Sequence, residues 1–289
     1  MKKFFSLALS LAMVFLLSAA AFAATPLSGY PSTQKIEINE YEALKKLAEE
    51  TPAVLSASGY SSAEIAKIQN YQETYFHHIT ELQTLSDNAL VNHGYTKTQI
   101  DIIKNFTGTE EEMSRAAASL TIYAGTSSFK YVDGGYTTGR LAYSWNWSGV
   151  PAVKMKDMVA AAWNGWELTG ETSRVYYHDI YTGAAYTTQS ATHVNPTNAS
   201  WNGRGHKFDM AISDNLYYAK SGSGSFDVKS DGLYQKNFLY CVEYGHETIL
   251  WDISFSVSAP GGGAGSISFS VGTSVAGSDS GAFRWDESQ

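Results

Sequence analysis

Two segments near the C-terminus alternate strictly between apolar and polar residues, and this pattern limits the possible folds more than any other feature of the chain. Residues 251–257 read WDISFSV and residues 266–271 read SISFSV. A period of two places every apolar side chain on one face of an extended strand. The glycine-rich stretch 260–263 between them predicts a β-hairpin with one apolar and one serine-lined face.

Further strand signals fill the region before this hairpin. Short runs enriched in Val, Ile, Tyr and Trp are separated by Gly, Asn and Ser. The runs expected to be strands cover residues 141–147, 174–181, 216–219, 224–228 and 237–244. Residues 154–164 suit a short helix or a strand, and the flanking Trp and Gly residues favour the strand. Many short strands with Gly-rich turns predict an antiparallel β-sandwich-like domain.

The first half of the chain carries helix-start signals that repeat once, at an offset of 35 residues. The motif Gly-Tyr-Ser/Thr-x-x-Glu/Gln begins at Gly59 and again at Gly94. The glycine suits the left-handed conformation that ends a helix. Ser61 and Thr96 then match the capping box that starts the next helix, and Thr109 begins a third capping box. The expected helices cover residues 39–50, 62–86, 97–106 and 110–124.

These patterns predict an α+β protein in which an all-helical segment, with about four helices and a two-copy repeat, precedes the β-sandwich-like domain. The composition shifts to Gly, Ser, Tyr and Trp near residues 125–128, and all seven tryptophans lie after residue 140. The expected organisation is a signal peptide over 1–23, a helical domain over 34–124, a β-domain over 129–277 and a tail over 278–289.

The N-terminus has the three parts of a secretory signal peptide. Lys2 and Lys3 supply the positive start, residues 4–17 are almost wholly apolar, and an Ala-Phe-Ala cleavage pattern ends at Ala23. The apolar run is shorter than the ~20 residues that a spanning helix needs. We therefore expect a secreted bacterial protein whose mature chain begins near Ala24, with no transmembrane span after cleavage.

The net charge limits the partners that the chain is expected to bind, and the cysteine content limits its disulfides. The net charge is −8, and removal of the two leader lysines takes it to −10. Because nucleic acids are polyanions, no nucleic-acid partner is expected. Cys241 is the single cysteine, which excludes an intramolecular disulfide. Its apolar neighbours in the sequence predict a buried side chain rather than a reactive thiol. The oligomeric state is left open.

The common catalytic and metal-binding motifs are missing from the sequence. It contains no H-E-x-x-H, no G-x-S-x-G and no P-loop. His77 and His78 are adjacent on an expected helix and point about 100° apart, unlike a metal pair at i and i+4. Cys241 and His246 are five residues apart, on opposite faces of one expected strand. No cofactor or metal is expected, and the sequence favours a protein that is not an enzyme.

Acidic residues near the expected strands offer the remaining routes to catalysis or calcium binding. A polysaccharide hydrolase needs two facing carboxylates. The candidates for such a pair are Glu243, Glu247, Asp209 and Asp252. The candidates for a calcium ligand are Asp179, Asp214, Asp227 and Asp231, which lack a calcium-loop motif. Acids at strand ends are usually solvated, so neither site is favoured.

Aromatic residues supply the leading functional hypothesis, a non-catalytic binding protein. Aromatic side chains on a rigid β-face suit a glycan, a cell-envelope component or a protein partner. The candidate binding residues are Trp145, Trp147, Trp163, Trp166 and Trp201. Trp145 and Trp147 share one strand face, which is either a binding surface or part of the core.

Two alternative functions stay open. The amphipathic hairpin of residues 251–271 has the pattern of a membrane-inserting β-hairpin, which would make the protein membrane-active or pore-forming. Its arms are shorter than the ~9–11 residues of a spanning strand, and a half-buried strand in a sandwich shows the same pattern. The other alternative is a secreted polysaccharide hydrolase that uses paired carboxylates.

Overall fold

The computed structural model of this chain describes residues 32–57, 60–132, 135–163, 165–197, 202–230, 237–247, 255–258, 266–269 and 273–284. The helices are α1 (Glu40–Ala48), α2 (Pro52–Ala57), α3 (Ser62–Gln69), α4 (Tyr71–Gln83), α5 (Asp87–His93), α6 (Lys97–Lys104) and α7 (Glu110–Ala116). The strands are β1 (Ser32–Asn39), β2 (Ser119–Val132), β3 (Tyr136–Ser148), β4 (Lys156–Trp163), β5 (Trp166–Asp179), β6 (Ala185–Gln189), β7 (Thr192–Val194), β8 (Asn202–Asp209), β9 (Ala211–Ile212), β10 (Tyr217–Ser230), β11 (Asn237–Glu247), β12 (Phe255–Ser258), β13 (Ser266–Phe269) and β14 (Thr273–Arg284). The expected signal peptide lies outside the described residues.

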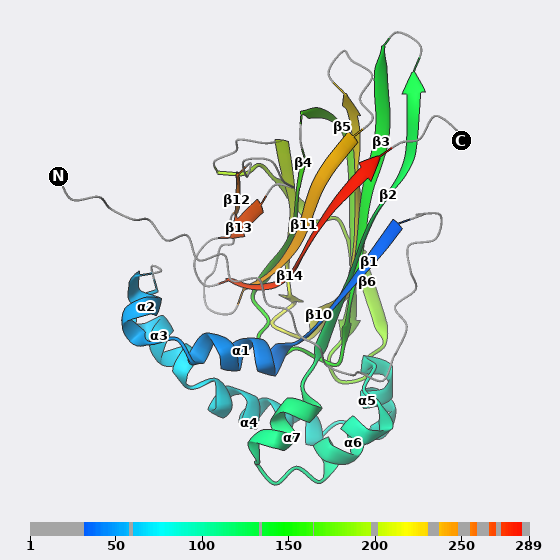
Figure 1. Ribbon diagram of the computed structural model, residues 1–289. Helices are drawn as coiled ribbons and strands as arrows, with labels where there is room; N and C mark the ends of the chain where they lie inside the picture. Colours follow the sequence, from blue (N-terminus) through cyan, green and yellow to red (C-terminus); the bar gives the residue numbers. More distant parts are fainter. Residues whose placement is uncertain are drawn as a thin grey trace, which may run out of the picture.

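Two antiparallel sheets account for most of the strands. The first sheet has the order β1-β2-β3-β10-β5-β6, with β9 paired to β10, and the second has the order β14-β11-β4-β8-β7. The helices all lie in sequence between β1 and β2, and they occupy the lower part of the molecule, beyond one end of the long strands (Figure 1). The chain is therefore a mixed α+β protein with a β-rich part, as its sequence predicts.

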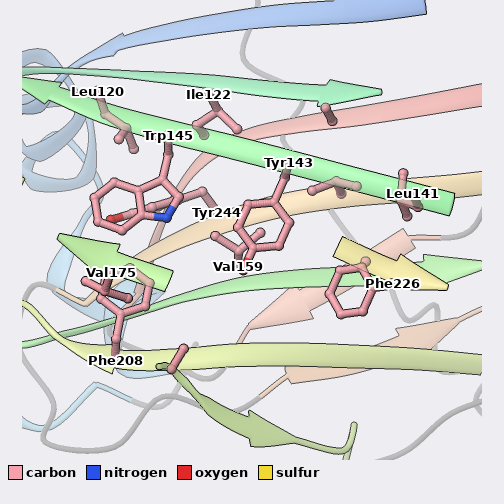
Figure 2. Packing of buried hydrophobic residues seen from close by; sticks show 14 of the residues in the cluster. Leu120, Ile122, Leu141, Tyr143, Trp145, Val159, Val175, Phe208, Phe226 and Tyr244 are labelled. Atoms are coloured by element: carbon pink, nitrogen blue, oxygen red, sulfur yellow. The ribbon is translucent and has the colours of Figure 1, made fainter. Parts of the chain in front are cut away.

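Side chains from both sheets meet in one hydrophobic core. Trp145 of β3 stacks on Phe208 of β8, with ring centroids 4.8 Å apart and planes at 6°. Figure 2 shows both rings in this core, close to Val175 of β5. Since β3 and β8 belong to different sheets, this contact joins the two sheets by apolar packing, which is the dominant favourable term in folding.

The capping signals of the helical segment are confirmed. Ser61, Thr96 and Thr109 each accept a hydrogen bond from the third following backbone N–H, and each forms a complete capping box. Gly94 ends α5 with φ of 93°, in the left-handed region that glycine adopts without a Cβ clash. The matching Gly59 lies outside the described residues.

The helix expected over residues 62–86 is two helices instead. Asn70, with φ of −97° and ψ of 22°, ends α3 and begins α4. Asn competes for nearby backbone hydrogen bonds, which weakens a helix interior. The stripe of apolar residues continues across the break, because Ile68, Tyr75 and Ile79 are all buried. The expected amphipathic pattern is therefore correct, but the single long helix is wrong.

The helix expected over residues 110–124 is wrong beyond Ala116, because Ser119 starts strand β2. Leu120, Ile122 and Ala124 alternate along this strand and enter the core between the sheets. The strand pairs on one side with β1 and on the other with β3. Pairing with two strands, one of them distant in sequence, outweighs the weak local preference for helix. The composition shift near residues 125–128 therefore falls inside a strand.

Most of the expected strands form where the structure describes the chain, but the two runs expected at 216–219 and 224–228 belong to one strand, β10. Residues 156–163 of the ambiguous segment form β4. Strands β12 and β13 pair as a hairpin, with Val257 opposite Ile267, while residues 251–254, the connecting residues 260–263 and residues 270–271 lie outside the described residues. Strand β14 pairs with β11 and extends to Arg284, into the segment expected to be a tail.

Candidate functional site

Four of the five candidate tryptophans are core residues. Trp145 and Trp147 are 2% exposed, and Trp163 and Trp166 are 0% exposed. Trp201 lies outside the described residues. Trp145 and Trp147 do share one face of β3, but that face is covered by the second sheet. The expectation that these four residues form an exposed binding face is therefore wrong, because the sheet that covers them is distant in sequence.

Of the four candidate carboxylates, the structure describes the side chains of Glu243 and Asp209, and it does not bring these two together. Glu243 of β11 is level with Ala160 of β4, and Ala160 is level with Gly205 of β8. Asp209 therefore lies two strands away and four residues along from the rung of Glu243. Strand spacing and rise per residue put their Cα atoms about 16 Å apart, whereas glycosidase carboxyl groups lie about 5–9.5 Å apart. Glu247 and Asp252 lie in parts of the chain whose side chains are not described.

Two of the calcium candidates have their carboxylate oxygens engaged by the protein. Asp179 Oδ1 accepts hydrogen bonds from the backbone N–H groups of Tyr181 and Thr182, at 2.9 and 2.8 Å. Both oxygens of Asp227 accept hydrogen bonds from Arg140. Asp231 lies outside the described residues. Asp214 differs from these residues, because it lines a cavity.

This cavity lies where the helices meet the ends of the strands, and its volume is about 640 Å³. Its wall combines α4 and the residues after it, the β3–β4 connection, the turn after β5 and the turn before β10. The lining residues are His78, Glu81, Leu82, Thr84, Leu85, Val150, Ala152, Lys154, Ile180, Tyr181, Asp214 and Asn215. A volume of about 300–1,000 Å³, an apolar wall and a few polar groups are typical of small-molecule sites.

The polar groups of the cavity include one buried amine and one neutral imidazole. Burial lowers the pKa of His78 to about 4, so its ring is uncharged near neutral pH and donates from Nε2 to the Val150 carbonyl at 2.9 Å. Burial also lowers the pKa of Lys154, whose ammonium donates to the Pro151 carbonyl at 3.1 Å. The wall therefore carries two carboxyl side chains, Glu81 and Asp214, and one amine, Lys154.

The turn on one side of the cavity has an unusual backbone. Ser213, Asp214 and Asn215 have successive φ values of 52°, 55° and 66°. The left-handed region is uncommon for residues other than glycine, although Asp and Asn tolerate it best. Residues held in such conformations concentrate at binding and catalytic sites. This turn places Asp214 and Asn215 in the cavity wall.

Exposed aromatic side chains continue from the cavity along the first sheet. Tyr181 is 61% exposed, and Tyr186 of β6 is 54% exposed. Tyr186 stacks on Tyr217 of β10, with ring centroids 3.5 Å apart and planes at 6°. Leu216, next to Asn215, is 42% exposed, and its carbonyl accepts a hydrogen bond from the Ile180 N–H. Tyr181, Tyr186, Leu216 and Tyr217 are called the tyrosine patch below.

A buried ionic cluster supports the cavity from behind. Glu40 at the start of α1, Asp157 of β4 and His246 of β11 are all at most 2% exposed. His246 Nδ1 lies 2.9 Å from Asp157, and Nε2 lies 3.3 Å from Glu40. Glu40 also accepts hydrogen bonds from the N–H groups of Ala152 and Val153, at 2.9 and 3.1 Å. The cluster thus positions the β3–β4 connection that lines the cavity, and it has no access to solvent.

Charge–charge interactions shift the pKa values of this cluster. Burial lowers the pKa of His246, but the carboxylates of Asp157 and Glu40 outweigh burial and raise it to about 10. Burial raises the pKa of Glu40, and the bonds from His246, Tyr75 and Ala152 outweigh it, so the net pKa is lowered. His246 is therefore an imidazolium near neutral pH, held between two carboxylates.

A second polar cluster lies at the edge where the two sheets meet. Side-chain ligand atoms of Glu171, His193 and His206 lie within 4.8 Å of one another. These residues come from three strands, so no spacing within a single helix or strand predicts the cluster. One signal was available: Arg204 and His206 alternate on a strand and therefore share a face.

Comparison with known proteins assigns no family to the chain. No protein-family profile and no curated protein matches it. AvmM, which catalyses macrocyclization in alchivemycin A biosynthesis, is 11% identical with a TM-score of 0.27, over 57% of this chain and 90% of that one. The collagen-binding domain of Erysipelothrix rhusiopathiae surface protein RspB is 8% identical with a TM-score of 0.26, and the match covers 57% of this chain and 65% of that domain. A pore-forming protein is 9% identical with a TM-score of 0.22, and the match covers 57% of this chain and 78% of that protein.

Similarities at this level support no functional argument. Among the helices of the described residues, none has the length and apolar character needed to cross a bilayer.

Proposed function

We propose that the chain is a secreted, non-catalytic binding protein whose ligand is a neutral saccharide held in the cavity and against the tyrosine patch. The leading support is the cavity itself, which joins a suitable volume to an adjacent exposed aromatic surface. Secretion is part of the proposal and follows from the leader sequence at residues 1–23. In this proposal the two sheets act as a β-sandwich scaffold, and the capped helices, with their two-copy repeat, form the opposite wall of the site.

The chemistry of the wall favours a saccharide over other small ligands. A pyranose ring has an apolar face of C–H groups and a rim of hydroxyls. Tyrosine rings suit the apolar face, since they combine a large apolar surface with a polar tip. The carboxylates of Glu81 and Asp214 can accept hydrogen bonds from hydroxyls, and the amide of Asn215 can both accept and donate them. The wall has two carboxyl groups and one amine, a composition that disfavours an anionic ligand.

Binding to an array of microbial and extracellular-matrix glycans, followed by titration calorimetry, tests this proposal. We expect Tyr181→Ala and Tyr186→Ala to weaken binding by about tenfold or more, which is about 1.4 kcal/mol. The matched control is Tyr136→Ala, at the opposite end of β3, which should bind as wild type. An array without any bound saccharide, or a Tyr181→Ala variant with unchanged affinity, contradicts the proposal.

One observation favours a second candidate function, membrane insertion. Strands β12 and β13 form a separate two-stranded sheet. Phe255, Val257 and Ile267 pack over small residues of the second sheet, including Ala160 and Ala162. Phe255 also fits against a glycine of β8, because a Cβ on Gly205 would lie 2.8 Å from its ring. The backbone N–H and the hydroxyl of Thr197 also donate to the Phe255 carbonyl, at 2.8 and 3.1 Å. If released from these contacts, the hairpin would expose an amphipathic strand pair.

Release of a fluorescent dye from lipid vesicles tests the second candidate. Wild-type protein should release the dye, and Val257→Asp should abolish release, because a charge on the lipid-facing side is costly in a bilayer. Ser256→Asp, on the other face of the same strand, should retain release. Circular dichroism must show that both variants fold. A wild-type protein that leaves vesicles intact contradicts membrane insertion and leaves the saccharide proposal unaffected.

A further inference from the structure

Two histidines from neighbouring strands face each other at the edge of the β-domain. His193 of β7 is the direct cross-strand partner of His206 of β8. Directly opposite residues in an antiparallel pair have Cβ atoms about 4.5–5.5 Å apart, so their side chains can act together. Their ring centroids lie 4.7 Å apart. The second sheet therefore presents two imidazoles side by side.

The first sheet supplies a carboxylate to the same point. Glu171 of β5 lies 3.0 Å from His193 Nδ1 through Oε1 and 3.1 Å from His206 Nε2 through Oε2. In a tetrahedral zinc site each ligand atom lies about 2.0–2.2 Å from the metal, so two ligand atoms lie roughly 3.4 Å from each other. The two nitrogen–oxygen distances therefore need to open by only a few tenths of an ångström to admit zinc.

Each histidine is oriented by a further contact on its other nitrogen. Tyr143 OH lies 2.5 Å from His206 Nδ1, and Ser173 Oγ lies 3.4 Å from His193 Nε2. Ser173 is fixed in turn, since its Oγ accepts a hydrogen bond from the Ala191 N–H at 3.0 Å. Metal-binding histidines commonly have such a partner, which sets the tautomer and the ring orientation.

The exposure of the two histidines gives an ion access to the site. The His193 side chain is 33% exposed and that of His206 is fully buried. An ion can therefore approach from the His193 side.

Arg204 is expected to lower the affinity of this site for a cation. It donates to Glu171 from Nε and Nη2, at 2.9 and 2.6 Å. A carboxylate has about four lone-pair positions, so Glu171 can hold both Arg204 and a metal. The guanidinium nevertheless repels a cation and competes for the same oxygens. The alternative interpretation is an ion-pair network that binds no metal.

We propose that Glu171, His193 and His206 form a zinc site that links the two sheets and leaves one coordination position open to solvent. Two imidazoles and one carboxylate suit Zn²⁺, whereas Ca²⁺ and Mg²⁺ prefer ligand sets made of oxygen. Three protein ligands with an open fourth position is the arrangement of an accessible zinc ion rather than a closed structural one. The site is distinct from the cavity and does not depend on the saccharide proposal.

Calorimetry and thermal melting of the untagged full chain with ZnCl₂ test the site. We expect one zinc per chain and a rise in melting temperature of several degrees at about 100 times the dissociation constant. MgCl₂ and CaCl₂ should cause no shift. Absence of both heat and melting shift with ZnCl₂ overturns the proposal.

Three variants distinguish zinc bound at this site from zinc bound elsewhere on the protein. His193→Ala should lower zinc affinity by more than about tenfold, and Arg204→Leu should raise it by removing the competing cation. His77→Ala is the matched control, because His77 is an exposed histidine on α4 and should leave affinity unchanged. Equal zinc affinity in wild type and His193→Ala overturns the proposal, as does an Arg204→Leu variant that only melts earlier without binding zinc more tightly.

Discussion

Replacing His246 with leucine is expected to lower the free energy of unfolding by about 3–5 kcal/mol. The substitution removes the cation between Glu40 and Asp157, and both carboxylates then stay buried without their partner. Removal of one member of a buried ion pair is costly for this reason. Urea denaturation of wild type and His246→Leu measures the difference. His77→Leu, at an exposed helix position, is the control and should change stability by less than about 0.5 kcal/mol.

The loss of stability caused by His246→Leu should become smaller as the pH rises. The folded-state pKa of His246 is raised from 6.5 to about 10. Its stabilising contribution is therefore complete below pH 6.5 and is lost as the pH rises towards 10. Glu40 has a lowered pKa, so its contribution is present above its unfolded value of 4.5 and is lost as the pH falls below it. The difference between wild type and His246→Leu should shrink from pH 6.5 to 10, and a difference that grows over this range would contradict the ion-pair assignment.

Trp145→Ala is expected to cost about 3–5 kcal/mol, the usual range for an aromatic residue removed from a core. Trp145 stacks on Phe208, contacts Tyr244 edge-on and covers Gly222, where a Cβ would lie 2.6 Å from the indole. Strands from both sheets hold these neighbours in place, so the space left by the indole cannot close easily. Urea denaturation or thermal melting measures the loss.

The surface variant Tyr181→Ala provides the comparison. Its side chain is 61% exposed, so its loss should change stability by about 0.5 kcal/mol or less. Together the two variants separate the core from the proposed binding surface, since Trp145→Ala should impair folding and Tyr181→Ala should impair binding alone. A Trp145→Ala protein that melts with the wild type would show that this side chain is not in the core.

Local signals in this chain were reliable where the structure depends on neighbours in sequence. The capping boxes at Ser61, Thr96 and Thr109 formed as predicted because each involves residues three apart. The hairpin of β12 and β13 also followed from its own alternating pattern. The extent of the helices was less predictable. Strand β2 formed where helix was expected, because β1 and β3 supply its partners.

The sequence by itself determined that Trp145 and Trp147 lie on one strand face, since residues two apart in a strand always do. Only the tertiary structure decided that this face is covered by the second sheet, and that Tyr181 and Tyr186 are more exposed than the described tryptophans. The polar clusters show the same division. Glu40 and His246 are 206 residues apart, and Glu171, His193 and His206 come from three strands of two sheets. Local pattern carries no information on such contacts, because they form only when distant strands pair and two sheets pack.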